Sequence, residues 1–312
     1  MNARRLMAAA LLAAAVPAAR AAAPGVGFGE SMFSLTSARQ AGSGGIALED
    51  LWRQGSGVEA TTVVLTSGLR WFGLSTQGGA SPRLRLCFDG FYFAPKSVTR
   101  TFEQTDGSYG GTAGTVSSSE WGARIDAILV VVAWDPWRIA VIGRTFGLNQ
   151  TLPDVVNAGV GADAGAQAML TLGGGRALTG WALAGPLGWG ANRLFASELT
   201  LGAGFLQQFG AGFLGGPEGF AAGGEGLRLS ERLLSGKLGL VYWFGRPHGK
   251  GATTYLRMGL RYLEGTSQPA QPRAGLGILW RTDAGLGIQF DYAVAPMGEI
   301  GYEHFGSLGL RF

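Results

Sequence analysis

Few residues in this chain have the chemistry that catalysis needs, and they lie far apart. His248 and His304 are the only histidines, and Cys87 is the only cysteine. A hydrolase places a base beside a nucleophile or an activated water, and a metal site groups His, Cys or carboxylate ligands at short spacing. Neither pattern is present, and GRPHGK at 245–250 is one residue short of a phosphate-binding loop. We therefore expect a protein that is not an enzyme and binds no cofactor or metal.

The remaining candidates are charged side chains that alternate with apolar ones. In EWGARIDAILVVVAW at 120–134, Trp121 and Ile125 lie on an apolar face, and Arg124 and Asp126 lie on the other. The split recurs in later segments, and its polar face gives these candidates: Arg124, Asp126, Arg138, Arg144, Asp163, Arg257, Arg261 and Asp291. They can form salt-linked networks that stiffen an interior, or they can line a conduit or a docking site.

Alternation with a period of two predicts strands that are wet on one face only. Candidate strands lie at 60–67, 69–76, 83–94, 120–134, 137–147, 160–172, 177–184, 197–207, 219–230, 234–244, 252–263, 272–281, 284–293 and 303–312. Fourteen is an even number, as in single-chain bacterial barrels. Twelve is the alternative count, because 219–230 is the weakest segment and the connection before it is long for a turn.

The order of the strands fixes the side on which each connection lies. Connections after odd strands are expected outside the cell, at 95–119, 148–159, 185–196, 264–271 and 294–302. The short connections WDP, GGGR, GRPHGKG and RTD are then periplasmic turns.

A soluble antiparallel sandwich also has alternating strands, so the pattern alone leaves two fold classes open. The segments are about 8 to 13 residues long, which suits a tilted bilayer crossing. Trp121, Trp134 and Trp280 lie near segment ends, where interfacial girdles occur. With the export signal described next, these features favour an all-β fold, a transmembrane antiparallel β-barrel.

The first 21 residues are organised as a signal peptide. Arg4 and Arg5 precede a short apolar run, and Ala19 and Ala21 are the small residues that a signal peptidase reads. Cleavage changes the count from 25 basic and 21 acidic residues to 22 basic and 21 acidic ones. The mature chain therefore has no basic excess, and we expect no nucleic acid as a partner.

The segment at 22–58 does not alternate, and we expect it to fold into the lumen as a plug before the barrel at 59–312. AGSGG at 41–45 is typical of flexible, closely packed chain. GIALEDLWRQGSG at 45–57 predicts one short helix with an apolar face.

Two aromatic features remain. The chain ends on YEHFGSLGLRF, in which Leu308, Leu310 and Phe312 form an apolar face toward outer-membrane lipid. This ending resembles the signal that barrel-assembly machinery recognises, so that machinery is an expected partner. A second group, Phe205, Phe209, Phe213 and Phe220, suggests an apolar contact with an unidentified partner.

The terminal block IQFDYAVAPMGEIGYEHFGSLGLRF resembles the closing region of the PorV/PorQ family of outer-membrane proteins, which belongs with the FadL-like barrels. KLGLVYWFG and YLRMGLRYLEG resemble the preceding hairpin, GADAGAQAML and the LAGPLG loop resemble two middle elements, and SARQAGSGGIALED resembles the Gly-rich start. The resemblance implies a fourteen-stranded barrel of the bacterial outer membrane with an N-terminal segment inside.

The resemblance implies one of two functions. A PorV-like protein would bind exported protein cargo, and secretion-system proteins, in a type IX-like secretion or surface-attachment pathway. A FadL-like protein would be a transporter of hydrophobic small molecules and would bind a hydrophobic ligand. An apolar pocket in the lumen would favour the second function.

Overall fold

The computed structural model describes residues 37–43, 56–65, 70–79, 81–93, 98–103, 109–116, 119–152, 155–190, 199–209, 219–230, 233–245, 250–263, 269–296 and 301–312. The predicted signal peptide and most of the predicted plug lie outside the described residues, so both stay predictions. His248 also lies outside them.

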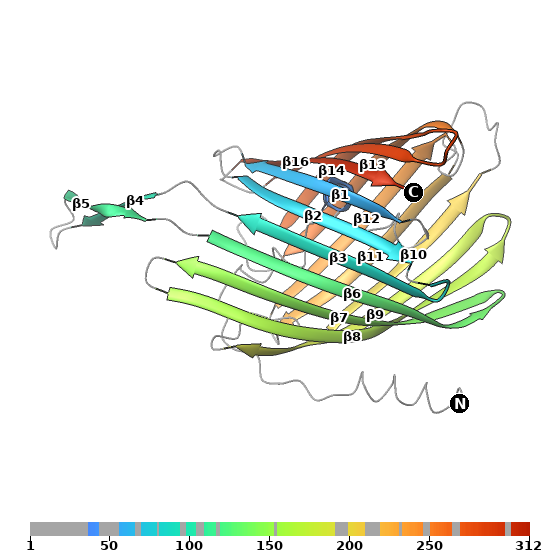
Figure 1. The fold of residues 1–312 in the computed structure, drawn as a ribbon, viewed down its shortest axis with the longest axis horizontal. Coiled ribbons are helices and arrows are strands. Elements are labelled where there is room, and N and C mark those ends of the chain that lie inside the picture. The colour runs from blue at the N-terminus through green and yellow to red at the C-terminus, as the bar shows by residue number, and fades with distance from the viewer. Residues whose placement is uncertain are drawn as a thin grey trace.

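Fourteen antiparallel strands form a closed barrel (Figure 1). They are β1 (Gly57–Leu65), β2 (Arg70–Gly79), β3 (Leu84–Phe93), β6 (Ser119–Trp134), β7 (Trp137–Leu152), β8 (Val155–Gly173), β9 (Arg176–Gly190), β10 (Leu199–Gln208), β11 (Gly219–Ser230), β12 (Leu233–Phe244), β13 (Gly251–Leu263), β14 (Ala270–Arg281), β15 (Gly287–Pro296) and β16 (Tyr302–Arg311). The predicted count of fourteen is confirmed, and the weakest predicted strand, 219–230, is present as β11.

The first and last strands close the barrel. β1 and β16 pair from Gly57 opposite Arg311 to Leu65 opposite Glu303. The pairing extends to the last residue, because the Phe312 N–H donates to the Ser56 carbonyl at 3.0 Å and the Ser56 N–H donates back at 3.2 Å. Complete closure leaves no sheet edge in this wall.

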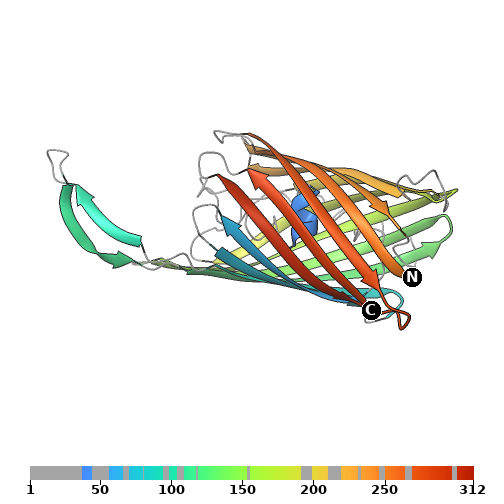
Figure 2. The ribbon, with the colours of Figure 1, turned by 90° about the horizontal axis from the view of Figure 1, so that it is seen from above.

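The segment predicted as the external loop 95–119 contains a hairpin. Strands β4 (Val98–Glu103) and β5 (Tyr109–Val116) pair with each other in a separate sheet, and β3 pairs directly with β6. The hairpin projects beyond one end of the barrel (Figures 1 and 2). Asp106-Gly107 between two Thr- and Val-containing runs is a hairpin signal, so the sequence did contain this element.

The wall near the hairpin is taller than predicted. Most of the predicted loop 148–159 is strand, because β7 continues to Leu152 and β8 begins at Val155. β9 likewise continues to Gly190, so the LAGPLG segment is strand and not loop. In these strands the backbone pairing extends past the residues that alternate between apolar and polar. A strand predicted from hydrophobic periodicity is therefore shorter than the strand in the structure.

The outward face of the wall is apolar and carries aromatic residues at two levels. We call the end with the short turns and the C-terminus the turn end, and the end with the β4–β5 hairpin the loop end. Exposed aromatics at the turn end are Trp134, Trp137, Trp280 and Phe312. Those at the loop end are Tyr92, Trp121, Tyr262, Tyr292 and Tyr302. Trp121 and Trp134 on β6 are separated by about 30 Å along the barrel axis, at ~3.3 Å per residue and a tilt of ~45°, which matches a bilayer.

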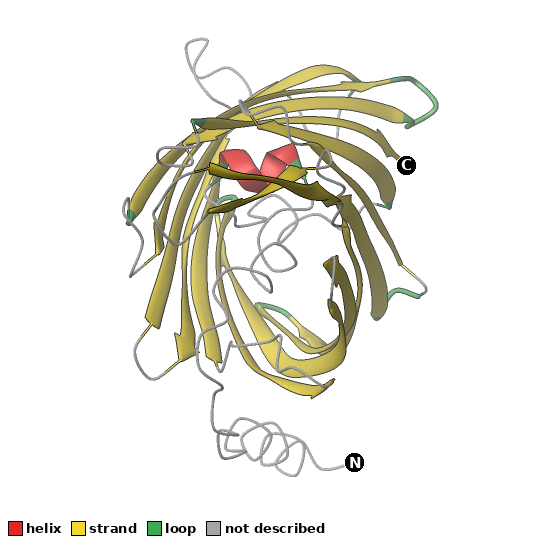
Figure 3. Ribbon diagram, turned by 90° about the vertical axis from the view of Figure 1, so that its left-hand side faces the viewer, coloured by secondary structure: helices red, strands yellow, loops and turns green. Residues whose placement is uncertain are grey.

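One short helix, α3 (Ala38–Gly42), lies inside the barrel against one wall (Figures 2 and 3). Its N-cap is Ser37, whose hydroxyl accepts a hydrogen bond from the Gln40 N–H at 3.3 Å. The last two residues of this helix fall within the stretch 41–45, which was predicted to be flexible. The helix predicted at 45–57 lies almost wholly outside the described residues. Among the described residues, no helix is both long enough and apolar enough to cross a membrane.

Candidate functional site

The described interior of the barrel carries networks of charged side chains, and the first one crosses four neighbouring strands. Arg124 on β6 forms an ion pair with Asp89 on β3 and lies 3.4 Å from Asp126. Arg144 on β7 then bridges Asp126 at 3.0 Å and Asp163 on β8 at 3.4 Å. Acidic and basic groups alternate along this ladder, so each charge has a neighbour of opposite sign.

Four of the five ladder residues are sequence candidates, and Asp89 was missed. Arg85, Cys87 and Asp89 alternate with Leu84, Leu86 and Phe88 in β3. An alternation with a period of two in β3 would have assigned Asp89 to the inward face. Arg138 lies on the same face of β7 as Arg144 by alternation, nearer the turn end.

The second network lies beneath α3 at the barrel seam. Glu59 on β1 is shared by Arg39 of α3, at 2.6 Å from Nη2, and by Arg311 of β16, at 2.8 Å. Arg311 Nε also donates to Gln289 Oε1 on β15 at 2.9 Å. Glu59 and Gln289 are almost completely buried, so this carboxylate holds two strands and the helix together in a water-poor environment.

Two further sequence candidates join this network. Arg257 on β13 lies 2.7 Å from Asp291 on β15, and both side chains are buried. Arg39 reaches Asp291 at 4.0 Å. These two candidates are therefore connected to Arg39, Glu59 and Arg311, which were not among the candidates. Arg311 could have been included, because it lies on the mixed face of the closing strand.

Small residues allow α3 to approach the wall closely. Ala38 and Ala41 pack against Val63, Ala293 and Phe305. The Ala38 N–H donates to the Ser307 hydroxyl at 2.8 Å. A Cβ on Gly42 would lie 2.9 Å from the Cα of Gly275 on β14, so the helix ends in backbone contact with the sheet.

An apolar cluster covers the inward face of β9 to β14 toward the turn end. Its buried members are Trp181, Ala221, Val241, Trp243, Tyr255 and Leu279. The alternation predicts a polar inward face, so this buried apolar cluster is a correction. The sequence contained a signal, since Val241 and Trp243 alternate with Leu240 and Tyr242, which makes both faces of β12 apolar.

Polar groups border this cluster. Trp181 Nε1 donates to Glu225 Oε2 at 3.1 Å, and Lys237 Nζ lies 2.7 Å from Glu225 Oε1. On the other side the guanidinium of Arg257 lies 5.1 Å from the centre of the Tyr255 ring. The cluster is therefore an apolar patch between charged groups that already have partners.

The last of the candidate charges, Arg261, lies nearer the loop end. Arg261 and Arg273 both interact electrostatically with Glu303. Glu303 is buried near the start of β16.

The closing strand has the orientation that its alternation predicts. Leu308, Leu310 and Phe312 are exposed on the outward face, and Ser307 and Arg311 are buried on the inward face. Recognition of this strand by assembly machinery stays a prediction.

The histidine and cysteine positions do not come together in the described part of the barrel. His304 lies on the outward face, where its Nδ1 is 2.6 Å from the Tyr292 hydroxyl. Cys87 is half-buried on β3. In the described residues, no group of three or more His, Cys, Asp or Glu is placed to hold a metal ion.

Solved structures of hydrocarbon channels have a similar fold. A variant of TodX, a monoaromatic hydrocarbon channel, matches with a TM-score of 0.57 and 9% identity, over 88% of this chain and 97% of its own. The Pseudomonas putida toluene transporter TodX matches with a TM-score of 0.55 and 11% identity, over 89% of this chain and 98% of its own. CymD, a monoaromatic hydrocarbon channel, matches with a TM-score of 0.53 and 11% identity, over 90% of this chain and 97% of its own.

CdiB from Acinetobacter baumannii also matches, with a TM-score of 0.48 and 10% identity over 83% of this chain, but the chain spans only 60% of its length. No protein-family model and no curated protein matches the sequence. The likeness shows that the chain has the same barrel fold as TodX and CymD. Membership of the PorV/PorQ family stays a prediction.

Proposed function

We propose that this chain is a channel for hydrophobic small molecules in the bacterial outer membrane. The observation that carries the proposal is the apolar cluster on the inward face of β9 to β14, with Trp181, Trp243 and Tyr255 as its aromatic members. A channel for hydrophilic solutes has a polar interior. The buried side chains of this cluster keep water from this side of the wall, and we infer that a hydrophobic solute passes against them.

The fold supports the same substrate class. TodX and CymD are hydrocarbon channels that this chain matches over nearly their whole length, which favours transport over the PorV-like binding of secreted cargo. The apolar outward face and its two aromatic levels support a place in a bilayer. The turn end is then periplasmic, and the β4–β5 hairpin extends from the cell surface.

Uptake of a labelled monoaromatic hydrocarbon tests the proposal. The chain is expressed with its own N-terminus in a bacterial strain that takes up toluene poorly, and initial uptake of labelled toluene is compared with uptake of a small sugar. We expect faster toluene uptake and unchanged sugar uptake. A folded barrel, recognised by its shifted mobility on an unboiled gel, that leaves toluene uptake unchanged would contradict the proposal.

A further inference from the structure

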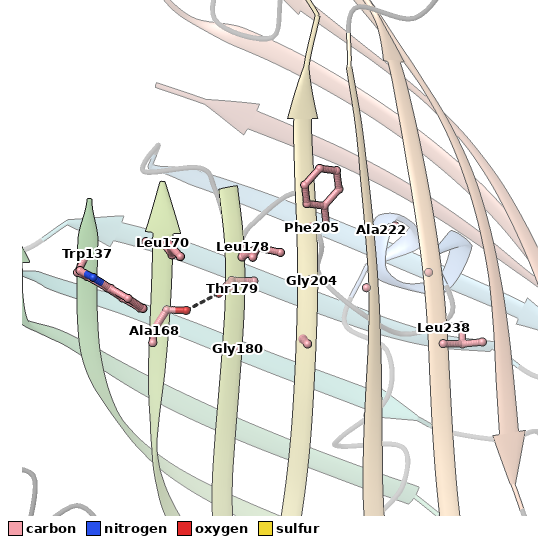
Figure 4. A pocket seen from close by; sticks show the side chains of 13 residues that line it. Trp137, Ala168, Leu170, Leu178, Thr179, Gly180, Gly204, Phe205, Ala222 and Leu238 are labelled. Carbon is pink, nitrogen blue, oxygen red and sulfur yellow. Dashed lines mark hydrogen bonds between the residues drawn. The ribbon is translucent and has the colours of Figure 1, made fainter. Parts of the chain in front are cut away.

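A shallow groove of about 760 Å³ runs across the outward face of the barrel from β7 to β12. Its floor consists of small residues, Ala168, Gly180, Ala203 and Ala222. Figure 4 shows it between the larger side chains of Trp137, Leu178, Phe205 and Leu238. The groove therefore arises because small side chains on the central strands are bordered by large ones.

The groove opens toward the surroundings of the barrel and not toward the lumen. Leu178 and Leu238 at its border are 43% and 59% exposed. Thr179 has its hydroxyl 3.1 Å from the Ala168 carbonyl and 3.3 Å from the Gln167 amide, on the buried side of the wall. The exposed part of the groove is thus apolar and faces hydrocarbon in a membrane.

Aromatic rings place the groove at the periplasmic side of the membrane. Phe220 stacks at a tilt against Phe205, Phe209 and Tyr242, with ring centres 5.8 to 6.0 Å apart. Phe205 lies three positions before the end of β10. Three residues of the Phe-rich group that the sequence singles out therefore form one interfacial aromatic row beside the groove.

A positive charge lies next to the groove on the side of the turn end. Arg176 is the first residue of β9 and pairs opposite Gln207, just as Leu178 pairs opposite Phe205. Its Nε donates to Gln207 Oε1 at 2.8 Å. Arg176 is exposed, and among the described residues no carboxylate forms an ion pair with it. A neutral amide thus orients a guanidinium without neutralising it.

We propose that the groove and Arg176 together bind one glycerophospholipid of the periplasmic leaflet. An acyl chain lies in the groove between Leu178, Phe205 and Leu238, and the phosphodiester meets the guanidinium of Arg176. Arginine binds phosphate oxygens through several N–H donors at once, and basic groups beside apolar membrane surfaces are typical of lipid headgroup sites. The lipid is a resident ligand of the wall, and the site is independent of the hydrocarbon channel.

Native mass spectrometry of the purified barrel tests the site. Delipidated protein in detergent is titrated with phosphatidylethanolamine, and the fraction with one bound lipid is measured. Arg176→Gln removes the charge, and Ala203→Phe fills the groove. Arg83→Gln, in another exposed turn, and Ala252→Phe, on the outward face of β13, are matched controls.

We expect one retained lipid in the wild type and in both controls. Arg176→Gln should weaken binding about fivefold to tenfold, the effect of losing one charge-assisted contact, and Ala203→Phe should abolish it. Diacylglycerol lacks the phosphate, so the wild type should bind it no more tightly than the Arg176→Gln variant binds the phospholipid.

Three results would overturn the proposal. Equal lipid retention in all variants would show that the groove binds no lipid selectively. Equal binding of diacylglycerol and phospholipid would show that no contact with the phosphate contributes to binding. A protein dimer that Ala203→Phe dissociates, with no lipid adduct, would make a second copy of the chain the occupant. Arg176→Gln changes only an exposed side chain, so it stays informative if Ala203→Phe does not fold.

Discussion

Trp181 on β9 lies directly opposite Gly202 on β10, and its indole ring covers the glycine. A Cβ added to Gly202 would lie 2.1 Å from ring atoms of Trp181. Gly219 and Trp243 repeat the arrangement across β11 and β12, where the added Cβ would lie 2.2 Å from the ring. Glycine thus makes room for aromatic rings that lie flat on the neighbouring strand.

Gly202→Val should destabilise the barrel by about 1–3 kcal/mol, because the added side chain overlaps the indole of Trp181. Urea unfolding in lipid vesicles, followed by tryptophan fluorescence, measures the change. Gly143→Ala is the control, since a Cβ there meets no atom within 4 Å. Equal stability of the two variants would mean that the ring can move aside.

Glu59→Gln should destabilise the barrel by about 3–5 kcal/mol, because it leaves the guanidinium groups of Arg39 and Arg311 buried without their shared counter-ion. The same unfolding measurement applies. Lys250→Gln, which breaks an exposed ion pair with Asp283, should change stability by at most ~0.5 kcal/mol. A small effect of Glu59→Gln would contradict a role for the shared carboxylate.

Arg257 and Asp291 should show strong coupling in a double-mutant cycle. Arg257→Met and Asp291→Leu each remove one member of this buried ion pair, whereas the double variant removes both charges. We expect the double variant to lose about 1–3 kcal/mol less than the sum of the single variants. Additive losses would show that the two side chains act separately.

Val241→Thr should slow toluene uptake. The two side chains have nearly the same shape, but the hydroxyl adds a polar group to a completely buried position in the apolar cluster. A cost of about 1 kcal/mol corresponds to roughly a fivefold loss of uptake. Val131→Thr makes the same change on the outward face of β6 and should leave uptake unchanged. Equal uptake in both variants would show that the apolar cluster does not contribute to transport.

Phe312→Ala should reduce the amount of folded barrel in the outer membrane several-fold, because it removes the terminal aromatic residue. Heat-dependent mobility on gels of membrane fractions measures the folded fraction. Phe290→Ala removes another exposed aromatic from the outward face and is the matched control. A similar loss for both variants would indicate lost lipid contact, and not a lost assembly signal.

The sequence predicts this barrel well wherever side chains alternate across a bilayer. Leu308 and Leu310 against Ser307 and Arg311 show the pattern, and β16 follows it residue by residue. Prediction fails at 148–159, where β7 continues to Leu152 and β8 begins at Val155, because this part of the sequence does not alternate between apolar and polar residues. It also fails for β4 and β5, whose turn signal was present but whose length fitted a loop.

The candidate site was predicted only in part, for a different reason. Alternation tells which face a residue lies on, so Arg124, Asp126, Arg144 and Asp163 could be assigned to the interior. It cannot tell which residues meet across the lumen or the seam. Arg39 and Glu59 are twenty positions apart in sequence, and Arg311 is far from both; only closure of the barrel brings them together.

The shared carboxylate of Glu59 links two structural features of the folded barrel. One is the meeting of the first and last strands, and the other is the docking of α3 within the lumen. While the seam is open, Glu59 on β1 lacks Arg311 on β16, so the docking surface for the helix is missing its β1 side. Closure of the barrel therefore completes the surface on which α3 lies, because it brings Glu59 of β1 to the residues that β15 and β16 already supply.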